Sequence, residues 1–140
     1  MTKTKGLATA GALMALLATI APQTADAFNG KFGVRVAPVS DVIFEVVPHS
    51  SGSGSIFWCG AADYARQVLG AGWKTKIYIA RGRGQSVTTN RRSAVQFTLD
   101  PAAAGITPAG PSISLNALTV GDNMSVQQAN QYCTMPPSRF

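Results

Sequence analysis

The strongest structural signal in this chain is an amphipathic stretch at residues 57–70. Small and apolar side chains recur there at the 3.6-residue spacing of one helical face, whereas Asp63, Arg66 and Gln67 fall on the opposite face. The apolar positions are Ala61, Tyr64, Ala65, Val68 and Leu69. Gly70 follows as the left-handed residue that commonly ends a helix. The pattern predicts a helix with one face in a core and the other in water.

Alternating side chains on both sides of this helix predict strands. The alternating stretches are residues 31–37, 42–47, 73–79 and 94–99, with Phe32 and Trp73 among the side chains expected on the buried faces. Pro38 predicts a turn between the first two strands, and the last two strands form a hairpin. A weaker pattern over residues 112–120 favours one further strand.

A short helix is predicted near the C-terminus. Ser125 stands three residues before Gln128, which is the spacing of a capping box. The buried face of this helix ends at Cys133 and can place that residue against the start of the first helix, near Cys59. We therefore expect an α+β fold: a small antiparallel sheet, one main helix packed on it, a short C-terminal helix and one disulfide.

The N-terminus has the three regions of a secretory signal peptide. Lys3 and Lys5 precede an uncharged run at residues 6–20, and Ala25-Asp26-Ala27 forms an A-x-A cleavage site. The apolar run is shorter than the ~20 residues that a bilayer span needs. We expect residues 1–27 to be removed, residues 28–133 to form a single domain without a transmembrane span, and residues 134–140 to be a flexible tail.

The net charge and the expected export together predict an anionic partner outside the cytoplasm. The chain has 12 basic and 6 acidic residues, and loss of the leader removes Lys3, Lys5 and Asp26, which leaves a net charge of +5. A basic periplasmic or secreted domain meets anionic envelope components such as lipid head groups and cell-wall polymers, and acidic proteins. Nucleic acid is disfavoured as a partner because export takes the protein away from it.

The two cysteines predict a disulfide. Cys59 and Cys133 both remain after cleavage, and an even number of cysteines in an exported protein is the usual condition for pairing. The bond would close a long loop, and in the chain-entropy model this closure stabilises the folded state by on the order of 4 kcal/mol.

An arginine-rich loop is the main functional candidate. Between the two strands of the predicted hairpin, Arg81, Arg83, Arg91 and Arg92 bracket glycines and hydroxyl side chains. Guanidinium groups, exposed backbone amides and hydroxyls are what carboxylate or phosphate capture requires. The hypothesis is a non-enzymatic binding or accessory protein. The alternative for this loop is a solvated basic segment that protects the hairpin edge from aggregation.

A second functional hypothesis concerns Cys59. A cysteine at a helix N-terminus has a stabilised thiolate, which would suit a cysteine-dependent hydrolase or transferase. Residues 57–60 resemble the aromatic-flanked cysteine that opens the catalytic helix of papain-like and cell-wall amidase families. Those families need a histidine after this helix, whereas the single histidine, His49, precedes it. We therefore expect no enzyme. One histidine cannot supply a metal site of the usual ligand number, and we expect no cofactor.

From about residue 46 to residue 133 the sequence resembles a group of small exported bacterial proteins, mainly alphaproteobacterial, that are uncharacterised. The residues that carry the resemblance are 57–65, 81–84, 91–100 and 120–122. The resemblance implies a bacterial envelope setting and no particular activity.

Overall fold

The computed structural model describes residues 27–50, 52–110 and 114–134. The predicted leader, apart from Ala27, and the predicted tail, apart from Thr134, lie outside these residues. Within the described part of the chain, no helix is long and apolar enough to cross a membrane.

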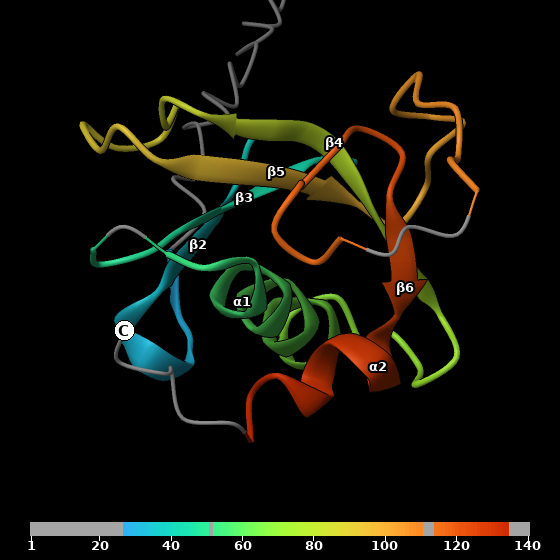
Figure 1. The fold of residues 1–140 in the computed structure, drawn as a ribbon, viewed down its shortest axis with the longest axis horizontal. Helices are drawn as coiled ribbons and strands as arrows, with labels where there is room; N and C mark the ends of the chain where they lie inside the picture. The colour runs from blue at the N-terminus through green and yellow to red at the C-terminus, as the bar shows by residue number, and fades with distance from the viewer. Residues whose placement is uncertain (1–26, 51, 111–113, 135–140) are drawn as a thin grey trace, which may run out of the picture.

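Six strands form one antiparallel sheet in the order β1-β2-β3-β5-β4-β6 (Figure 1). The strands are β1 (Phe28–Asn29), β2 (Arg35–Pro38), β3 (Phe44–Val47), β4 (Lys76–Gly84), β5 (Ala94–Thr98) and β6 (Asn123–Ser125). The hairpin of β2 and β3 and the hairpin of β4 and β5 meet through the pairing of β3 with β5. The two hairpins therefore share one continuous sheet, and the predicted α+β class is confirmed.

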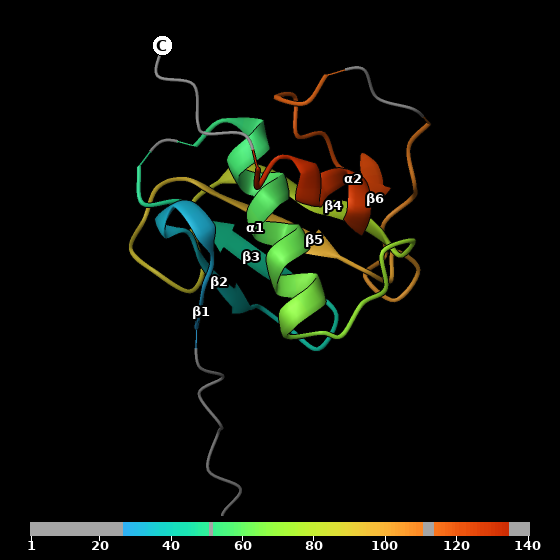
Figure 2. The ribbon, with the colours of Figure 1, turned by 90° about the horizontal axis from the view of Figure 1, so that it is seen from below.

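Two helices lie on the same face of this sheet (Figures 1 and 2). Helix α1 (Gly54–Gln67) packs across the sheet, and the shorter helix α2 (Val126–Gln131) lies beside it. Aromatic rings fill the space between α1 and the sheet: Trp58 contacts Phe97 with ring centroids 5.2 Å apart, and Tyr64 contacts Phe44 at 4.7 Å. This layer is the hydrophobic core.

The closest approach of α1 to the sheet is at Gly60. A Cβ atom added there would lie 2.7 Å from a methyl carbon of Val46 on β3. Real Cβ atoms do not come so close, so the helix axis can pack this near to the strand only where one residue lacks a side chain.

Helix α1 begins at Gly54, three residues earlier than the sequence predicts. Its first amide is not capped by the side chain of the neighbouring Ser53. Instead the side-chain oxygen of Asn116, 62 residues away, accepts from the N–H of Gly54 at 2.8 Å. The segment around residue 116 therefore supplies the helix cap, and Cys59 lies in the second turn of α1 and not at its N-terminus.

Several predicted faces of these elements are wrong, and each has a local cause. The helix ends at Gln67, so Val68 and Leu69 lie beyond it and are 50% and 46% exposed. Asp63 is buried because its carboxylate accepts from the side-chain amide of Gln67 and from the N–H of Lys31.

Two aromatic side chains predicted to be buried are exposed. Phe32 lies in a 3-10 turn (Lys31–Gly33) that precedes β2, with a positive φ of 59°. Trp73 precedes β4 and is 44% exposed, and the guanidinium of Arg66 lies 3.7 Å above its ring. Both residues fall just outside the strands to which the alternating pattern assigned them.

The C-terminal predictions divide into one that is confirmed and one that is wrong. Ser125 caps α2, because its hydroxyl accepts from the N–H of Gln128 at 3.1 Å. Within the described residues 114–120 there is no strand, since this segment packs against the start of α1 and against Gly82 of β4. The strand forms later, at β6, where it pairs with the first residues of β4.

The predicted disulfide is present. Cys59 of α1 and Cys133, which follows α2, are bonded with an S–S distance of 2.11 Å across 74 residues of sequence. Both cysteines are buried. The bond fastens the C-terminal end of α2 to the helix that carries most of the core.

Reduction of this bond should lower the free energy of unfolding by about 2–5 kcal/mol. The reason is that the unfolded chain gains conformational entropy when the cross-link between distant residues is broken. Urea unfolding with and without reductant measures the change. The double variant Cys59→Ala/Cys133→Ala is the control and should not respond to reductant. Equal unfolding midpoints for the oxidised and reduced wild type would contradict a stabilising role of the disulfide.

Candidate functional site

The predicted arginine-rich loop is divided between a strand and a shorter loop. Strand β4 continues to Gly84, so Arg81 and Arg83 belong to the strand, and the hairpin loop spans residues 85–93. Arg91 and Arg92 lie in this loop. The four arginines therefore do not form a single flexible cluster.

The tip of the hairpin loop folds over the sheet face opposite α1. Glu45 of β3 points to that face, because its neighbours Phe44 and Val46 point into the core. The alternation within residues 42–47 predicts that Glu45 faces water, yet its side chain is fully buried. Its burial shows that the hairpin loop gives the middle of the sheet a second cover.

The Glu45 carboxylate is surrounded by donors from the loop. Oε1 accepts from the Ser86 hydroxyl at 2.6 Å, from the N–H of Thr88 at 2.8 Å and from the Thr88 hydroxyl. Oε2 accepts from the N–H of Val87 at 3.1 Å. The amides and hydroxyls predicted to capture an external anion at this turn thus bind a carboxylate of the protein itself.

Ser86 also organises the turn around this carboxylate. Its hydroxyl oxygen accepts from the N–H of Thr89 at 2.9 Å and from the Thr89 hydroxyl at 2.8 Å. Short serine and threonine turns of this kind fix the backbone without a helix or strand. The loop is therefore held in one shape and in one position on the sheet.

The hydrogen bonds decide the ionisation of Glu45. Burial raises the pKa of this carboxyl, but the bonds from the Ser86 and Thr88 side chains and from the backbone of Val87 and Thr88 outweigh burial and hold the pKa below its ordinary value of 4.5. Glu45 is thus an anion at neutral pH, and its charge is balanced by oriented dipoles.

Arg83 of β4 and Arg91 of the hairpin loop both bond to the connection that leads into α1. Arg83 donates to the carbonyl of Gly52 at 2.9 Å, with its guanidinium 4.9 Å from the Phe57 ring. Arg91 donates to the carbonyl of His49 at 2.8 Å. Figure 2 shows the hairpin loop beside this connection at one end of the sheet. Each guanidinium has five N–H donors, so these bonds leave donors for a ligand.

Two adjoining concavities border this junction. The first has a volume of about 200 Å³ and is lined by Gly33, Arg35, Val47, Pro48, His49, Thr89 and Arg91. The second has a volume of about 230 Å³ and is lined by Pro48, His49, Ser50, Arg91, Arg92 and Ser93. Arg91 and His49 border both. We name the set Arg35, His49, Arg91 and Arg92 the basic face.

The basic face is positively charged without local compensation. No carboxylate lines either concavity. Among the described residues, the side chains of Arg35 and Arg92 make no hydrogen bond, and both are exposed. Guanidinium groups in this setting suit a carboxylate or a phosphate, which they can bind in a bidentate manner.

The structure separates the predicted site residues into two groups. Arg91 and Arg92 lie on the basic face, whereas Arg81 lies in β4 and donates to the carbonyl of Gln85 at 2.7 Å. Arg35 is not among the predicted site residues, because only the pairing of β3 with β5 brings the hairpin of β2 and β3 beside the loop that carries Arg91. Among the described residues, no cluster of His, Cys, Asp and Glu could hold a metal ion.

Comparisons with protein-family models, with curated proteins and with solved structures find no match.

Replacement of Glu45 by glutamine should lower the free energy of unfolding at pH 7 by about 1–3 kcal/mol, because charge-assisted hydrogen bonds become weaker ones and an NH₂ group faces donors. The folded-state pKa lies below the unfolded value, so the wild type holds this stability above pH 4.5 and loses it as pH falls through the folded pKa. Urea unfolding from pH 7 to pH 3 should show the difference between wild type and Glu45→Gln shrinking.

Asp41→Asn is the matched control. It makes the same carboxylate-to-amide change at an exposed residue between β2 and β3 whose carboxylate has no hydrogen bond among the described residues. Its stability should follow the wild type at every pH. A difference between wild type and Glu45→Gln that stays constant with pH would show that Glu45 is not held as an anion.

Proposed function

We propose that this protein is an exported, non-enzymatic binding or accessory module of the bacterial envelope that contacts an anionic ligand through its basic face. The observation that carries the proposal is the pair of concavities that share Arg91 and are lined by arginine without any carboxylate. A catalytic function would need an activated nucleophile or base, and the basic face offers neither beside the exposed His49.

The compartment and the charge support this setting. The leader-like N-terminus, the net charge of +5 without that leader, and the resemblance to small exported bacterial proteins agree on an envelope location. The Cys59–Cys133 disulfide fits an oxidising compartment.

The cysteine-dependent alternative finds less support. A thiol enzyme needs a free thiolate at Cys59, whereas this residue is bonded to Cys133, is fully buried and lies in the second turn of α1. Rapid alkylation of Cys59 in the unreduced protein would show a free thiol there and would favour the cysteine-dependent enzyme over the binding module.

The proposed ligand class is a phosphate carried by an envelope component. Concavities of about 200 and 230 Å³ admit one phosphate group together with part of what carries it. Arginine binds phosphate and carboxylate alike through paired N–H donors, so the two anions must be told apart by experiment.

The test replaces the arginines that have no hydrogen bond of their own. Arg35→Gln/Arg92→Gln removes two charges from the basic face without removing a described contact. The control, Lys74→Gln/Lys76→Gln, removes two charges from exposed side chains near the start of β4, away from the loop. Binding is followed by NMR titration with inorganic phosphate and by sedimentation with phosphatidylglycerol vesicles.

We expect the arginine variant to lose about tenfold or more in apparent affinity, to show a weaker dependence on salt, and to unfold within about 0.5 kcal/mol of the wild type. The lysine variant should bind almost as the wild type does. Equal losses in both variants would show a non-specific effect of net charge and would contradict a site at the basic face. Binding of polyglutamate in preference to both phosphate probes would replace the phosphate ligand by an acidic protein partner.

A further inference from the structure

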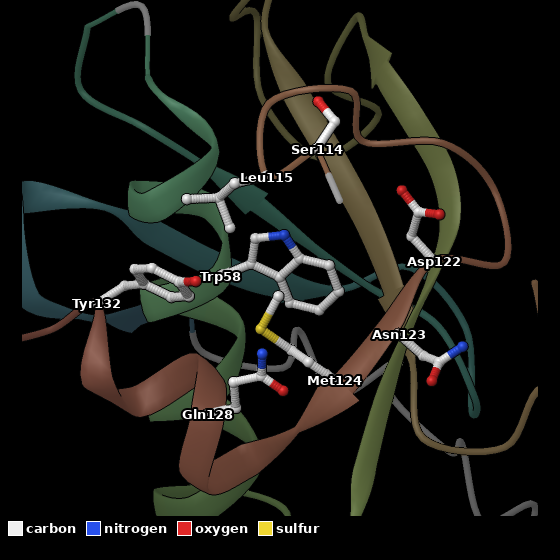
Figure 3. Close-up of a pocket in the computed structure, with 8 residues that line it drawn as sticks. All are labelled: Trp58, Ser114, Leu115, Asp122, Asn123, Met124, Gln128 and Tyr132. Atoms are coloured by element: carbon white, nitrogen blue, oxygen red, sulfur yellow. The ribbon is translucent and has the colours of Figure 1, made fainter. Parts of the chain in front are cut away.

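A second cavity lies away from the basic face, between the two helices and β6. It has a volume of about 120 Å³ and is lined by Trp58, Ser114, Leu115, Asp122, Asn123, Met124, Gln128 and Tyr132 (Figure 3). These residues come from α1, from the segment that covers the start of α1, from β6 and its preceding turn, and from α2. The cavity therefore depends on the packing of four separate parts of the chain.

The Trp58 indole is part of the cavity wall. It is 2% exposed and rests against Phe97 of β5, with ring centroids 5.2 Å apart. Figure 3 shows the Met124 thioether and the Leu115 side chain beside the indole, with the Tyr132 hydroxyl directed toward it. Aromatic faces and a thioether are polarisable groups that favour contact with an organic cation and its methylene carbons.

Two polar groups border this cavity. Asp122 is 7% exposed, and its Oδ2 accepts from the N–H of Thr119 at 3.2 Å. A carboxylate can accept about four hydrogen bonds, so Asp122 keeps capacity for a ligand. The second polar group is the indole N–H of Trp58. In Figure 3 the carboxylate and the indole nitrogen both lie toward Ser114. A ligand that carries both a donor and an acceptor is complementary to these two groups.

The charge of the cavity is opposite to that of the basic face. Asp122 is the one ionisable carboxylate in the lining, and no lysine, arginine or histidine borders the cavity. A largely buried carboxylate without a cation beside it is costly, and it favours a positively charged ligand over a neutral or anionic one.

We propose that this cavity binds a small organic ammonium compound that also carries an oxygen acceptor, as an amino alcohol does. Its ammonium group donates to Oδ1 of Asp122, its oxygen accepts from the Trp58 indole N–H, and its methylene groups lie on the indole and on Met124. The cavity volume of about 120 Å³ is enough for a ligand of a few non-hydrogen atoms. This site is separate from the proposed anion site, and the test of one does not depend on the result for the other.

Titration of the ¹⁵N-labelled protein with ethanolamine tests the proposal, with the indole N–H signal of Trp58 as the readout. The variant Trp73→Phe assigns that signal, because Trp73 is the second tryptophan and is exposed. Ethylene glycol and glycolate are the neutral and anionic probes of similar size. We expect a saturable shift with ethanolamine and none that saturates with the other two.

Two substitutions should move the ethanolamine affinity in opposite directions. Asp122→Asn should weaken binding about tenfold or more, because it removes the charge. Gln128→Glu should tighten binding severalfold, because it adds a carboxylate at an exposed position in the first turn of α2, where an anion is also favourable for the helix.

Asp100→Asn is the matched control for Asp122→Asn. Its Oδ1 accepts from the backbone N–H of Ala103 at 3.1 Å, as Oδ2 of Asp122 accepts from Thr119, but Asp100 does not line the cavity. This variant should bind ethanolamine as the wild type does.

Three outcomes would overturn the proposal: no saturable shift with ethanolamine, an equal response to ethylene glycol, or unchanged affinity in a folded Asp122→Asn variant. Should Asp122→Asn not fold, Gln128→Glu decides, and a failure to tighten ethanolamine binding would overturn the proposal.

Discussion

The buried carboxylate of Glu45 is the interaction on which the basic face depends. An anion in the middle of a sheet is tolerated only where donors surround it, and here the hairpin loop supplies those donors from Ser86, Val87 and Thr88. The carboxylate holds the loop down, and the loop hides the carboxylate from water. Arg91 is a few residues further along the same loop, so its position beside Arg35 follows from this anchor.

The core and the basic face lie in different parts of the molecule. The disulfide and the packing of α1 on β3 and β5 fix the core, and the cavity beside Trp58 lies within that packing. The basic face lies at the end of the sheet where the hairpin loop meets the connection into α1. A cationic surface and a small cavity with one carboxylate suit ligands of opposite charge, so the two proposed ligands would not compete for one site.

Sequence patterns predicted the elements well and the site only in part. The structure confirms the main helix, although its ends and part of its buried face differ from the prediction, and it confirms the cap at Ser125 and the disulfide. The burial of Glu45 was not predictable, because alternation within β3 assigns it to the polar face and gives no sign of a loop that returns over it. The placement of Arg35 beside the hairpin loop depends on the pairing of β3 with β5, which lie far apart in the sequence, and periodicity does not encode that pairing. For Glu45, the available signal in the sequence was one acidic residue between the apolar neighbours Phe44 and Val46.

The most direct test of the account is the affinity of Glu45→Gln for inorganic phosphate at neutral pH, measured by NMR with the core signals of α1 as evidence that the variant is folded. Simple electrostatics predicts tighter binding, because the substitution removes a negative charge near the basic face. Our account predicts weaker binding, because the hairpin loop loses the anchor that places Arg91. Unchanged or tighter binding in the folded variant would show that the basic face does not depend on Glu45 and would contradict the account.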